Sequence, residues 1–521
     1  MSQNLRPADI VARAESTLRN IQEVRDAVVM APDNHDTDRY QVYVVLDQES
    51  LSGTKDLNDA YLYTDEWKGL FEEIYSADST KLSVSRFSGW NDSYTGAPFS
   101  AAEMEEWVGT TVSRLAGLDL GNVLEIGCGT GLLLFPLAPR CLSYTAWDIS
   151  ETAINLISTR LSGHGINNVN LKTEAAHKLS ELEACSFDTI ILNSVVQYFP
   201  SPIYLWNVLS ECMRVITEHG RIFVGDIRDL RLLSSFHASR HCTLAPAETA
   251  AKDICRSVRR SMAAERELVL DPRFFRHALW NGRAPGHVEL QLRRGSTRNE
   301  LTRYRYDALI FPPSIKKGIA NPRRELAWGK PPVISLDFVV ALLGEEQPEE
   351  LVIWHVPNLR LRSDYALIST LKGVNEEMEL KSILSDAEHE MLDMGWIDPE
   401  LFWDLENHLP SYCVKIEPSD DNFAFHYNVI IRKRSIGNKY DSIVGQNNLC
   451  GASQECCKDW SNSPYTSRYV QMLTLQLRRE LRNFGLATIA LDVISLATIP
   501  RLENGIVDIG RLRETRSCRF F

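Results

Sequence analysis

The chain has 521 residues, 44% hydrophobic and 24% charged, so it is long enough for two to four domains with buried cores. Its formal net charge of −13 argues against a protein that binds duplex nucleic acid, which needs a basic surface. No apolar run reaches the ~18 residues of a membrane span, and the N-terminus lacks the apolar centre of a signal peptide. We therefore expect a cytoplasmic protein with no membrane partner. Its eleven scattered cysteines are expected to be reduced thiols, with no metal site.

The first segment, residues 6–47, has the pattern of a small α/β unit. Residues 7–21 have helical apolar spacing, and residues 24–30 and 40–46 have the composition of strands. A unit of this length cannot build its own core. We therefore expect it to pack against another part of the chain.

The next segment, residues 65–118, is expected to be helical, with Trp67, Phe71 and Ile74 on one stripe. A turn-rich stretch at 87–98 interrupts it and carries Trp90 and Tyr94. This loop is expected either to pack on the body of the protein or to form a lid over a neighbouring site.

From residue 121 to residue 228, strands and helices alternate. This order predicts a doubly wound sheet, whose ligand crevice lies at the carboxyl ends of its strands. The expected strands are 121–126, 143–148, 168–173, 187–192 and 221–225, and the expected helices lie near 132–138, 151–163 and 203–217.

A glycine-rich turn follows the first of these strands, with Gly127, Gly129 and Gly131 in the spacing G-x-G-x-G. Leu132 stands where a dinucleotide fingerprint has its last glycine, so no pyrophosphate loop is indicated. Asp148 ends the second strand, where a carboxylate can accept both hydroxyls of a ribose. A nucleoside site without phosphate suits S-adenosylmethionine (SAM). The alternative is an ordinary glycine turn beside a solvated aspartate.

The ends of the strands supply the other candidates for the cofactor site. Glu125, inside the motif, is expected to orient the glycine loop or the methionine amine of SAM. Asp226 is either part of the site or a structural carboxylate. The remaining candidates are Ile149, Glu174, Ala175, Ala176, Asn193 and Ser194.

The rest of the chain is predicted more coarsely. Residues 230–285 read as a helical cap, followed by strands at 287–292 and 304–311 and by a proline-rich linker at 312–332. Residues 335–433 are mixed, with strands at 351–356 and 423–431, and residues 432–468 are polar and loop-like. A helix at 467–484, a strand near 487–495 and a turn at 503–505 end the chain.

An ordered set of motifs resembles the methyltransferase domains embedded in non-ribosomal peptide synthetases. The set runs over most of 66–434, and while the glycine loop alone is a weak signal, the ordered set is highly specific. It comprises Phe87-Ser-Gly-Trp-Asn91, Tyr94-Thr-Gly96, Leu124-Glu-Ile-Gly-Cys-Gly-Thr-Gly131, Leu192-Asn-Ser-Val-Val-Gln-Tyr-Phe-Pro200, Gly225-Asp-Ile-Arg228, His287-Val-Glu-Leu-Gln-Leu292, Asn299-Glu-Leu-Thr-Arg-Tyr-Arg-Tyr306 and Val356-Pro-Asn358.

The two ends of the chain resemble the small C-terminal subdomain of the adenylation domains of the same synthetases, split in two at 7–47 and 467–511. The family writes Asn-Gly-Lys-Val-Asp where this chain has Asn504-Gly-Ile-Val-Asp508. Ile506 cannot offer a charge to a carboxylate or phosphate, and the large adenylation subdomain with its phosphate loop is absent. We therefore expect a degenerate scaffold that does not adenylate.

The resemblance implies an α/β fold of the class I SAM-methyltransferase type, a Rossmann-like doubly wound sheet with a helical cap. A small α+β subdomain made from both chain ends completes it. The expected domains are 1–64, the first part of the adenylation-like subdomain; 65–440, the methyltransferase domain with its cap; and 441–521, a linker and the second part of the subdomain.

The resemblance also implies N-methylation of an aminoacyl or peptidyl group on a carrier protein or synthetase module. Methyl transfer is an in-line displacement that needs a neutral amine, held close to the methyl group in a dry site. Glu300 is the best candidate to hold that nitrogen, with Tyr304 and Tyr306 nearby and Asn193 at a strand end. The other catalytic candidates are His237, as a base, and Tyr94. The alternative for Glu300 is surface pairing with Arg303 or Arg305, and for His237 it is helix packing.

Two other functions stay open at this point. The chain could methylate a free amino acid or small natural product at N, O or C, or it could be a non-catalytic partner of a synthetase. An intact glycine loop with Asp148 counts against the second of these.

Overall fold

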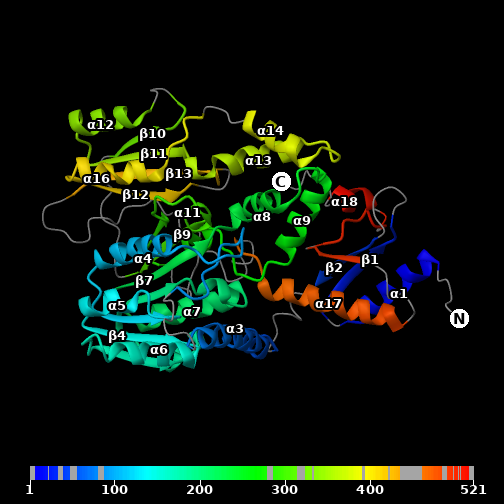
Figure 1. Ribbon diagram of the computed structural model, residues 1–521, viewed down its shortest axis with the longest axis horizontal. Coiled ribbons are helices and arrows are strands. Elements are labelled where there is room, and N and C mark those ends of the chain that lie inside the picture. The colour runs from blue at the N-terminus through cyan, green and yellow to red at the C-terminus, as the bar shows by residue number, and fades with distance from the viewer. Residues whose placement is uncertain are drawn as a thin grey trace.

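The computed structural model describes residues 6–21, 23–32, 39–46, 55–79, 87–277, 285–313, 323–330, 334–389, 394–419, 423–434, 460–483, 490–496, 498–502, 504 and 506–514. Its strands form three sheets (Figure 1). None of the helices in these ranges is long and apolar enough to cross a membrane.

The largest sheet has seven strands in the order β5-β4-β3-β6-β7-β9-β8. The first five run parallel, and β9 and β8 form antiparallel pairs at one edge. Reversal of strand order beside β3 places a crevice at the carboxyl ends of β3, β4 and β6. The strands are β3 Asn122–Ile126, β4 Ser143–Asp148, β5 Val169–Thr173, β6 Phe187–Asn193, β7 Ile216–Arg228, β8 His287–Leu292 and β9 Arg305–Phe311.

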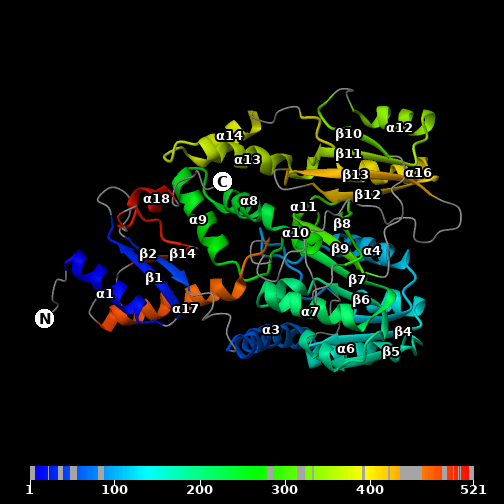
Figure 2. The ribbon, with the colours of Figure 1, turned by 180° about the vertical axis from the view of Figure 1, so that it is seen from behind.

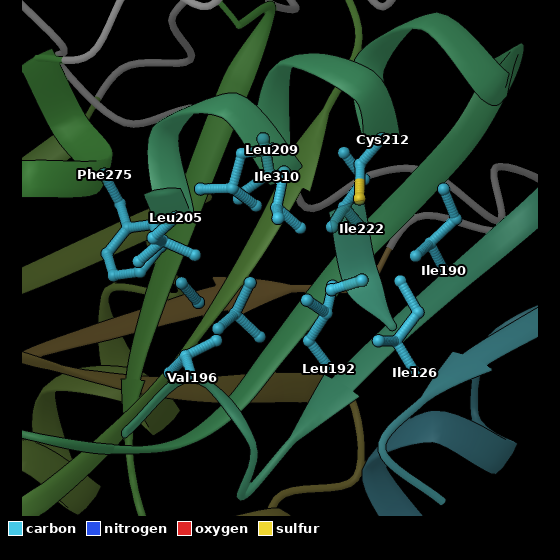
Figure 3. Close-up of a cluster of buried hydrophobic side chains, with 14 of the residues drawn as sticks. Ile126, Ile190, Leu192, Val196, Leu205, Leu209, Cys212, Ile222, Phe275 and Ile310 are labelled. Atoms are coloured by element: carbon cyan, nitrogen blue, oxygen red, sulfur yellow. The ribbon is translucent and has the colours of Figure 1, made fainter. Parts of the chain in front are cut away.

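Helices cover both faces of this sheet. On one face, Leu205, Leu209 and Cys212 of α7 (Pro202–Val215) pack on Ile190 and Leu192 of β6 and on the strands beside it (Figure 3). The other face carries α4 (Ala101–Ala116), α5 (Leu134–Leu137) and α6 (Glu151–Leu161), and the helix α3 (Lys55–Ser79) packs on α6. Burial of apolar side chains on both faces explains the near-continuous apolar sequences of the central strands.

A second sheet of four strands has the order β10-β11-β13-β12 and its own core. Its strands are β10 Arg323–Ala327, β11 Glu350–Pro357, β12 Tyr412–Pro418 and β13 His426–Lys433, and its helices include α12 Leu336–Glu345, α15 Pro399–Trp403 and α16 Leu405–His408. Beside the two sheets, α8 (Leu233–Leu244) and α9 (Ala251–Ala263) pack on α13 (Arg362–Gly373) and α14 (Leu380–His389) (Figure 2).

The third sheet joins the two ends of the chain, which lie side by side in both views (Figures 1 and 2). Strand β2 (Arg39–Leu46) pairs antiparallel with β1 (Val24–Met30) and parallel with β14 (Ala490–Ser495). Helices α1 (Pro7–Arg19) and α17 (Pro464–Asn483) pack on one face of the sheet, and α18 (Ile509–Glu514) on the other. Both clusters of buried side chains described in this unit draw on both ends, so the two ends form one unit as expected.

The predicted fold class is confirmed, with a doubly wound sheet, a helical layer and an α+β unit built from both ends. Two details were wrong. The expected linker at 312–332 contains the strand β10. The expected cap at 230–285 ends in a short helix, α10 (Arg273–His277), whose Phe274 and Phe275 lie in the main core. The expected turn at 503–505 and loop at 432–468 lie largely outside the described residues.

Candidate active site

The glycine loop closes over the end of β4. The amides of Gly127 and Cys128 donate to the carbonyl of Trp147 at 2.8 and 3.0 Å. Gly127 has a φ of +76°, and a Cβ there would lie 2.6 Å from Val195, so no other residue fits this turn. The loop therefore brings its backbone to the crevice, as the motif predicted.

Asp148 is buried at the end of β4, where it holds the loop. Its two carboxylate oxygens accept hydrogen bonds from the amides of Gly129 at 2.8 Å and Ser150 at 2.9 Å. Burial raises the pKa of Asp148, although both amides oppose this shift. Asp148 and Ile149 both line the crevice.

Glu125 lies beneath the loop with 3% of its surface exposed. It accepts a hydrogen bond of 2.8 Å from the Tyr144 hydroxyl. The pKa of Glu125 is raised to about 7, chiefly by burial. The hydrogen bond from Tyr144 opposes this shift, and the charge of Asp148 adds to it. Glu125 also lines the cavity, and its hydrogen bond goes to β4 rather than to the glycine loop.

A cavity of about 520 Å³ begins at the glycine loop. Asn193 and Ser194, at the end of β6, line it together with Glu174 and Ala176. Asn193 Oδ1 is buried and has no hydrogen-bond partner among the described residues. The oxygen lies against Gly225 of β7, where an added Cβ would be only 2.2 Å away, so it is packed inside the sheet beside the cavity.

One wall of the cavity is aromatic and comes from α3. Trp67, Phe71 and Tyr75 line it, and Tyr198 packs against Trp67 with ring centroids 4.6 Å apart. Glu72, also on α3, accepts a hydrogen bond of 2.7 Å from the amide of Glu151 at the start of α6. The sequence placed Trp67 and Phe71 on one helical stripe, with Ile74, but their place in the cavity wall and that of Tyr75 were missed.

The far end of the cavity contains Glu300, at the start of α11 (Glu300–Arg303). Glu300 is 6% exposed, its Oε1 accepts a hydrogen bond of 3.0 Å from Ser93, and its Oε2 has no hydrogen-bond partner among the described residues. Burial raises its pKa, although Arg305 opposes this. Arg303 and Arg305 pair with Asp364 and Asp226 instead, so Glu300 is not a surface ion-pair residue.

His237 of α8 lies in the same cavity wall as Glu300. Its Nε2 is 3.2 Å from Glu265, which also pairs with Arg228 at 3.1 Å. Burial alone would raise the pKa of Glu265, but Arg228 and His237 outweigh it and hold it at about 2. Glu265 thus stays ionised beside the imidazole, although neither ring nitrogen of His237 has a hydrogen-bond partner among the described residues. Sequence reasoning gave no role to Glu265, Arg228 or Ser93. Arg228 stands in the motif Gly225-Asp-Ile-Arg228, whereas Glu265 and Ser93 lie outside the motifs.

Asp226 is a structural carboxylate. It is fully buried, accepts a hydrogen bond of 3.1 Å from the Trp107 indole, and binds Ser194 and Arg305. Its backbone φ of +63° marks a break in the pairing of β7 with β9. It therefore anchors α4 and β9 to the end of β7.

Three further predicted residues do not line the cavity, as far as the described residues go. Gly131 and Ala175 shape the loops beside it. Tyr94 lies behind the wall, where its hydroxyl is 3.2 Å from the hydroxyls of both Ser239 and Tyr304. Trp90, from the same loop, does line the cavity and packs on Trp107.

The comparisons with known proteins agree with this geometry. A family model described as "Methyltransferase domain" matches residues 124–222, from β3 into β7. The chain is 34% identical over 410 residues to chondramide synthase cmdD of Chondromyces crocatus, covering 76% of this chain and 10% of that protein. It is 37% identical over 306 residues to a probable non-canonical non-ribosomal peptide synthetase, CymA, of Salinispora arenicola, covering 58% of this chain and 4% of that protein.

Solved structures match over smaller parts. The N-methyltransferase NodS of Bradyrhizobium japonicum is 19% identical, with 41% of this chain and 98% of NodS covered and a TM-score of 0.27. An S-adenosylmethionine-dependent methyltransferase from Clostridium acetobutylicum is 20% identical, with 25% and 52% covered and a TM-score of 0.23. The strand order of the sheet, and not either of these two structures, defines the fold.

The sheet, the glycine loop and the family match define a SAM-dependent methyltransferase of the class I fold. More particularly, the chain contains the methyltransferase domain and is homologous to a segment of the non-ribosomal peptide synthetases. It spans a tenth or less of the length of these relatives, 10% of the first and 4% of the second.

Proposed function

We propose that this chain transfers a methyl group from SAM to the amine of an aminoacyl or peptidyl group carried on a carrier protein. The observation that carries the proposal is one continuous cavity of about 520 Å³, which runs from the glycine loop to the buried Glu300. A cofactor held at one end and an acceptor held at the other would share a dry space.

The residues at the loop end fit SAM. Asn193 and Ser194 line this part of the cavity, and the turn at Gly127 brings the loop backbone to it. Asp148 would accept the ribose hydroxyls with Ile149 beside it, and Glu125, which lines the cavity, would orient the methionine amine. Bound SAM supplies an electrophilic methyl group on a sulfonium.

The residues at the far end fit an amine. Glu300 Oε2 is buried and free to accept an N–H, which would orient the nitrogen lone pair. His237, close to the ionised Glu265, also lines the cavity and would take up the amine's proton. The acidic groups favour a basic acceptor nitrogen, which supports N-methylation over transfer to carbon or oxygen.

We further propose that the unit formed by both chain ends is a scaffold derived from an adenylation subdomain. The expected lysine is replaced by Ile506, whose side chain is 62% exposed and carries no charge. An exposed isoleucine at this position supports docking or spacing rather than contact with an acyl-adenylate.

The test is intact-mass analysis of an aminoacyl-loaded carrier domain incubated with the protein and SAM, beside the same free amino acid. We expect a gain of one methyl mass on the loaded carrier, and much slower methylation of the free amino acid. Methylation of the free amino acid alone would support the small-molecule alternative. No methylation, with SAM bound, would support a non-catalytic partner of a synthetase.

A further inference from the structure

Two short sequences in different sheets are alike. Leu230-Arg-Leu-Leu-Ser234, after β7, matches Leu359-Arg-Leu-Arg-Ser363, after β11. Leu270-Asp-Pro-Arg-Phe-Phe275 likewise matches Ile397-Asp-Pro-Glu-Leu-Phe402. Such short matches also arise by chance, so they indicate a repeat only if the backbone around them has the same conformation.

The backbone repeats in detail. Asp226 and His355 have positive φ values of +63° and +59°, each at a break in strand pairing. Asp229 and Asn358 then each cap a short 3₁₀ turn through the side chain. Helices of 12 residues, α8 and α13, follow both turns.

The sheets repeat as well. In the first sheet, β6 lies parallel to β7, which is followed laterally by the antiparallel strands β9 and β8. In the second, β10 lies parallel to β11, followed by β13 and β12 in the same way. A helix with a serine cap, α7 or α12, connects the two parallel strands. We call residues 187–311 the first repeat and residues 323–433 the second repeat.

The contacts between the repeats are reciprocal. The amide of Ala251 donates to the carbonyl of Met378, and the amide of Leu380 donates to the carbonyl of Thr249, both at 2.8 Å. Ala250 and Glu379, which precede the matching helices α9 and α14, form a β-bridge with each other.

The side-chain contacts between the repeats are reciprocal too. Arg231 donates to the carbonyl of Ser419, directly after β12, and its counterpart Arg360 donates to the carbonyl of Arg293, directly after β8. When residue i touches j and the counterpart of i touches the counterpart of j, a two-fold axis relates the two units. Helix α8 accordingly packs on α13, and β8 on β12 (Figure 2).

The second repeat lacks the cofactor half of the fold. Strand β9 ends at Phe311 and β10 begins at Arg323, which leaves no room for counterparts of β3, β4 and β5. The glycine loop and the acidic residue at the end of β4 therefore have no counterpart in it, and a role other than binding SAM has to account for the repeat.

The polar contacts near the cavity break the symmetry. Asp364 of α13 is 1% exposed and receives two bonds of 2.6 Å from Arg303 and one of 3.0 Å from the Tyr304 hydroxyl. Tyr304 lines the cavity and Arg303 belongs to α11, which carries Glu300. Under the two-fold relation, Arg303 and Tyr304 of the first repeat correspond to Ala424 and Phe425 of the second, and Asp364 of the second corresponds to Ser235 of the first. These counterparts cannot form the same cluster.

We propose that the second repeat is a duplicate of the first that takes the place of a second subunit, and that its Asp364 is a positioning residue for the acceptor end of the cavity. Asp364 holds Tyr304 and α11, and through them the carboxylate of Glu300. That this part of the cavity receives the methyl acceptor rests on the proposed function. That Asp364 holds α11 in place does not depend on it.

The test compares Asp364→Asn and Tyr304→Phe with a matched control, Ser235→Ala, at the counterpart position. Tyr304→Phe removes one hydroxyl without leaving a buried charge unpaired, so it remains informative if Asp364→Asn fails to fold. Hydrogen exchange is followed at the amides of 301–304. Methylation is assayed with aminoacyl N-acetylcysteamine thioesters, and SAM binding is measured by calorimetry.

We expect both variants to exchange at least tenfold faster in α11 and to raise the KM for the thioester by about tenfold. The Kd for SAM should stay within twofold, and Ser235→Ala should change none of these values. Unchanged exchange and KM in the two variants, or equal changes in the control, would overturn the proposal. If the wild type methylates no thioester, the proposed acceptor is wrong, while the exchange rates still decide the role of Asp364.

Discussion

The carboxylate of Asp148 accepts a hydrogen bond of 2.8 Å from the amide of Gly129, so one residue holds the glycine loop and faces the cavity. Its other oxygen holds the start of α6 through Ser150. An aspartate in this position is placed before any ligand arrives, which lowers the ordering cost of binding.

The first prediction concerns this pair. Asp148→Ala should weaken SAM binding by about 1–3 kcal/mol, because a charge-assisted hydrogen-bond acceptor is lost. Isothermal calorimetry measures the change. Asp188→Asn is the control, since Asp188 holds the amide of Asn122 at the opposite end of the strands. Equal SAM affinity in Asp148→Ala and the wild type would show that Asp148 does not bind the ribose.

The second prediction concerns pH. The pKa of Glu125 is raised to about 7 by burial, above its value in the unfolded chain. The native state therefore binds this proton more tightly, and stability is lost as the pH rises from about 4.5 through 7. Because one pKa unit corresponds to ~1.4 kcal/mol, the loss is on the order of 3 kcal/mol.

Glu125→Gln tests this, since the amide oxygen can still accept the hydrogen bond from Tyr144. The difference in free energy of unfolding between variant and wild type, measured from pH 5 to pH 8, should shift in favour of the variant as the pH rises. A difference that does not change with pH would mean that Glu125 titrates normally.

The third prediction concerns the unit built from both chain ends. Val42, in the middle strand of its sheet, is fully buried between Val29 and Val493. Val42→Ala should destabilise this unit by about 1–3 kcal/mol through the cavity it leaves. Thermal unfolding followed by hydrogen exchange should show earlier opening of β1, β2 and β14 with unchanged SAM affinity.

Val224→Ala, in the core of the main sheet, is the matched control for this experiment. It should open the methyltransferase core and leave the end unit intact. If either variant opened the end unit and the methyltransferase core equally, the prediction that these two units open independently would be wrong.

Much of this structure could be predicted from the sequence, because strong local signals mark it. Buried parallel strands are continuously apolar, and a glycine loop followed by an acidic strand end is typical of a nucleoside site in a doubly wound sheet. Strand β10 was missed because it is an edge strand with the sequence Arg-Arg-Glu-Leu-Ala, of which only Leu326 is buried. An edge strand with one buried residue has no alternating pattern to detect.

The site was predicted in part for a related reason. Glu300 and Asp148 stand in motifs, whereas Glu265 and Asp364 reach the cavity region from segments without one. Their roles come from burial and from partners distant in sequence, such as Arg228 and Arg303. The repeat was present in the sequence as Leu-Arg-Leu and Asp-Pro, but only the matching hydrogen bonds make these short matches meaningful.

The central claim is that the cavity holds the methyl group of SAM next to an amine that Glu300 orients. Single-turnover methylation of an aminoacyl-loaded carrier by Glu300→Gln, with SAM affinity measured in parallel, tests it most directly. The amide keeps the shape and the bond from Ser93 but lacks the negative oxygen that would hold the amine. We expect the rate to fall by roughly 10²–10⁴-fold with SAM affinity unchanged. A wild-type rate in Glu300→Gln would contradict the claim.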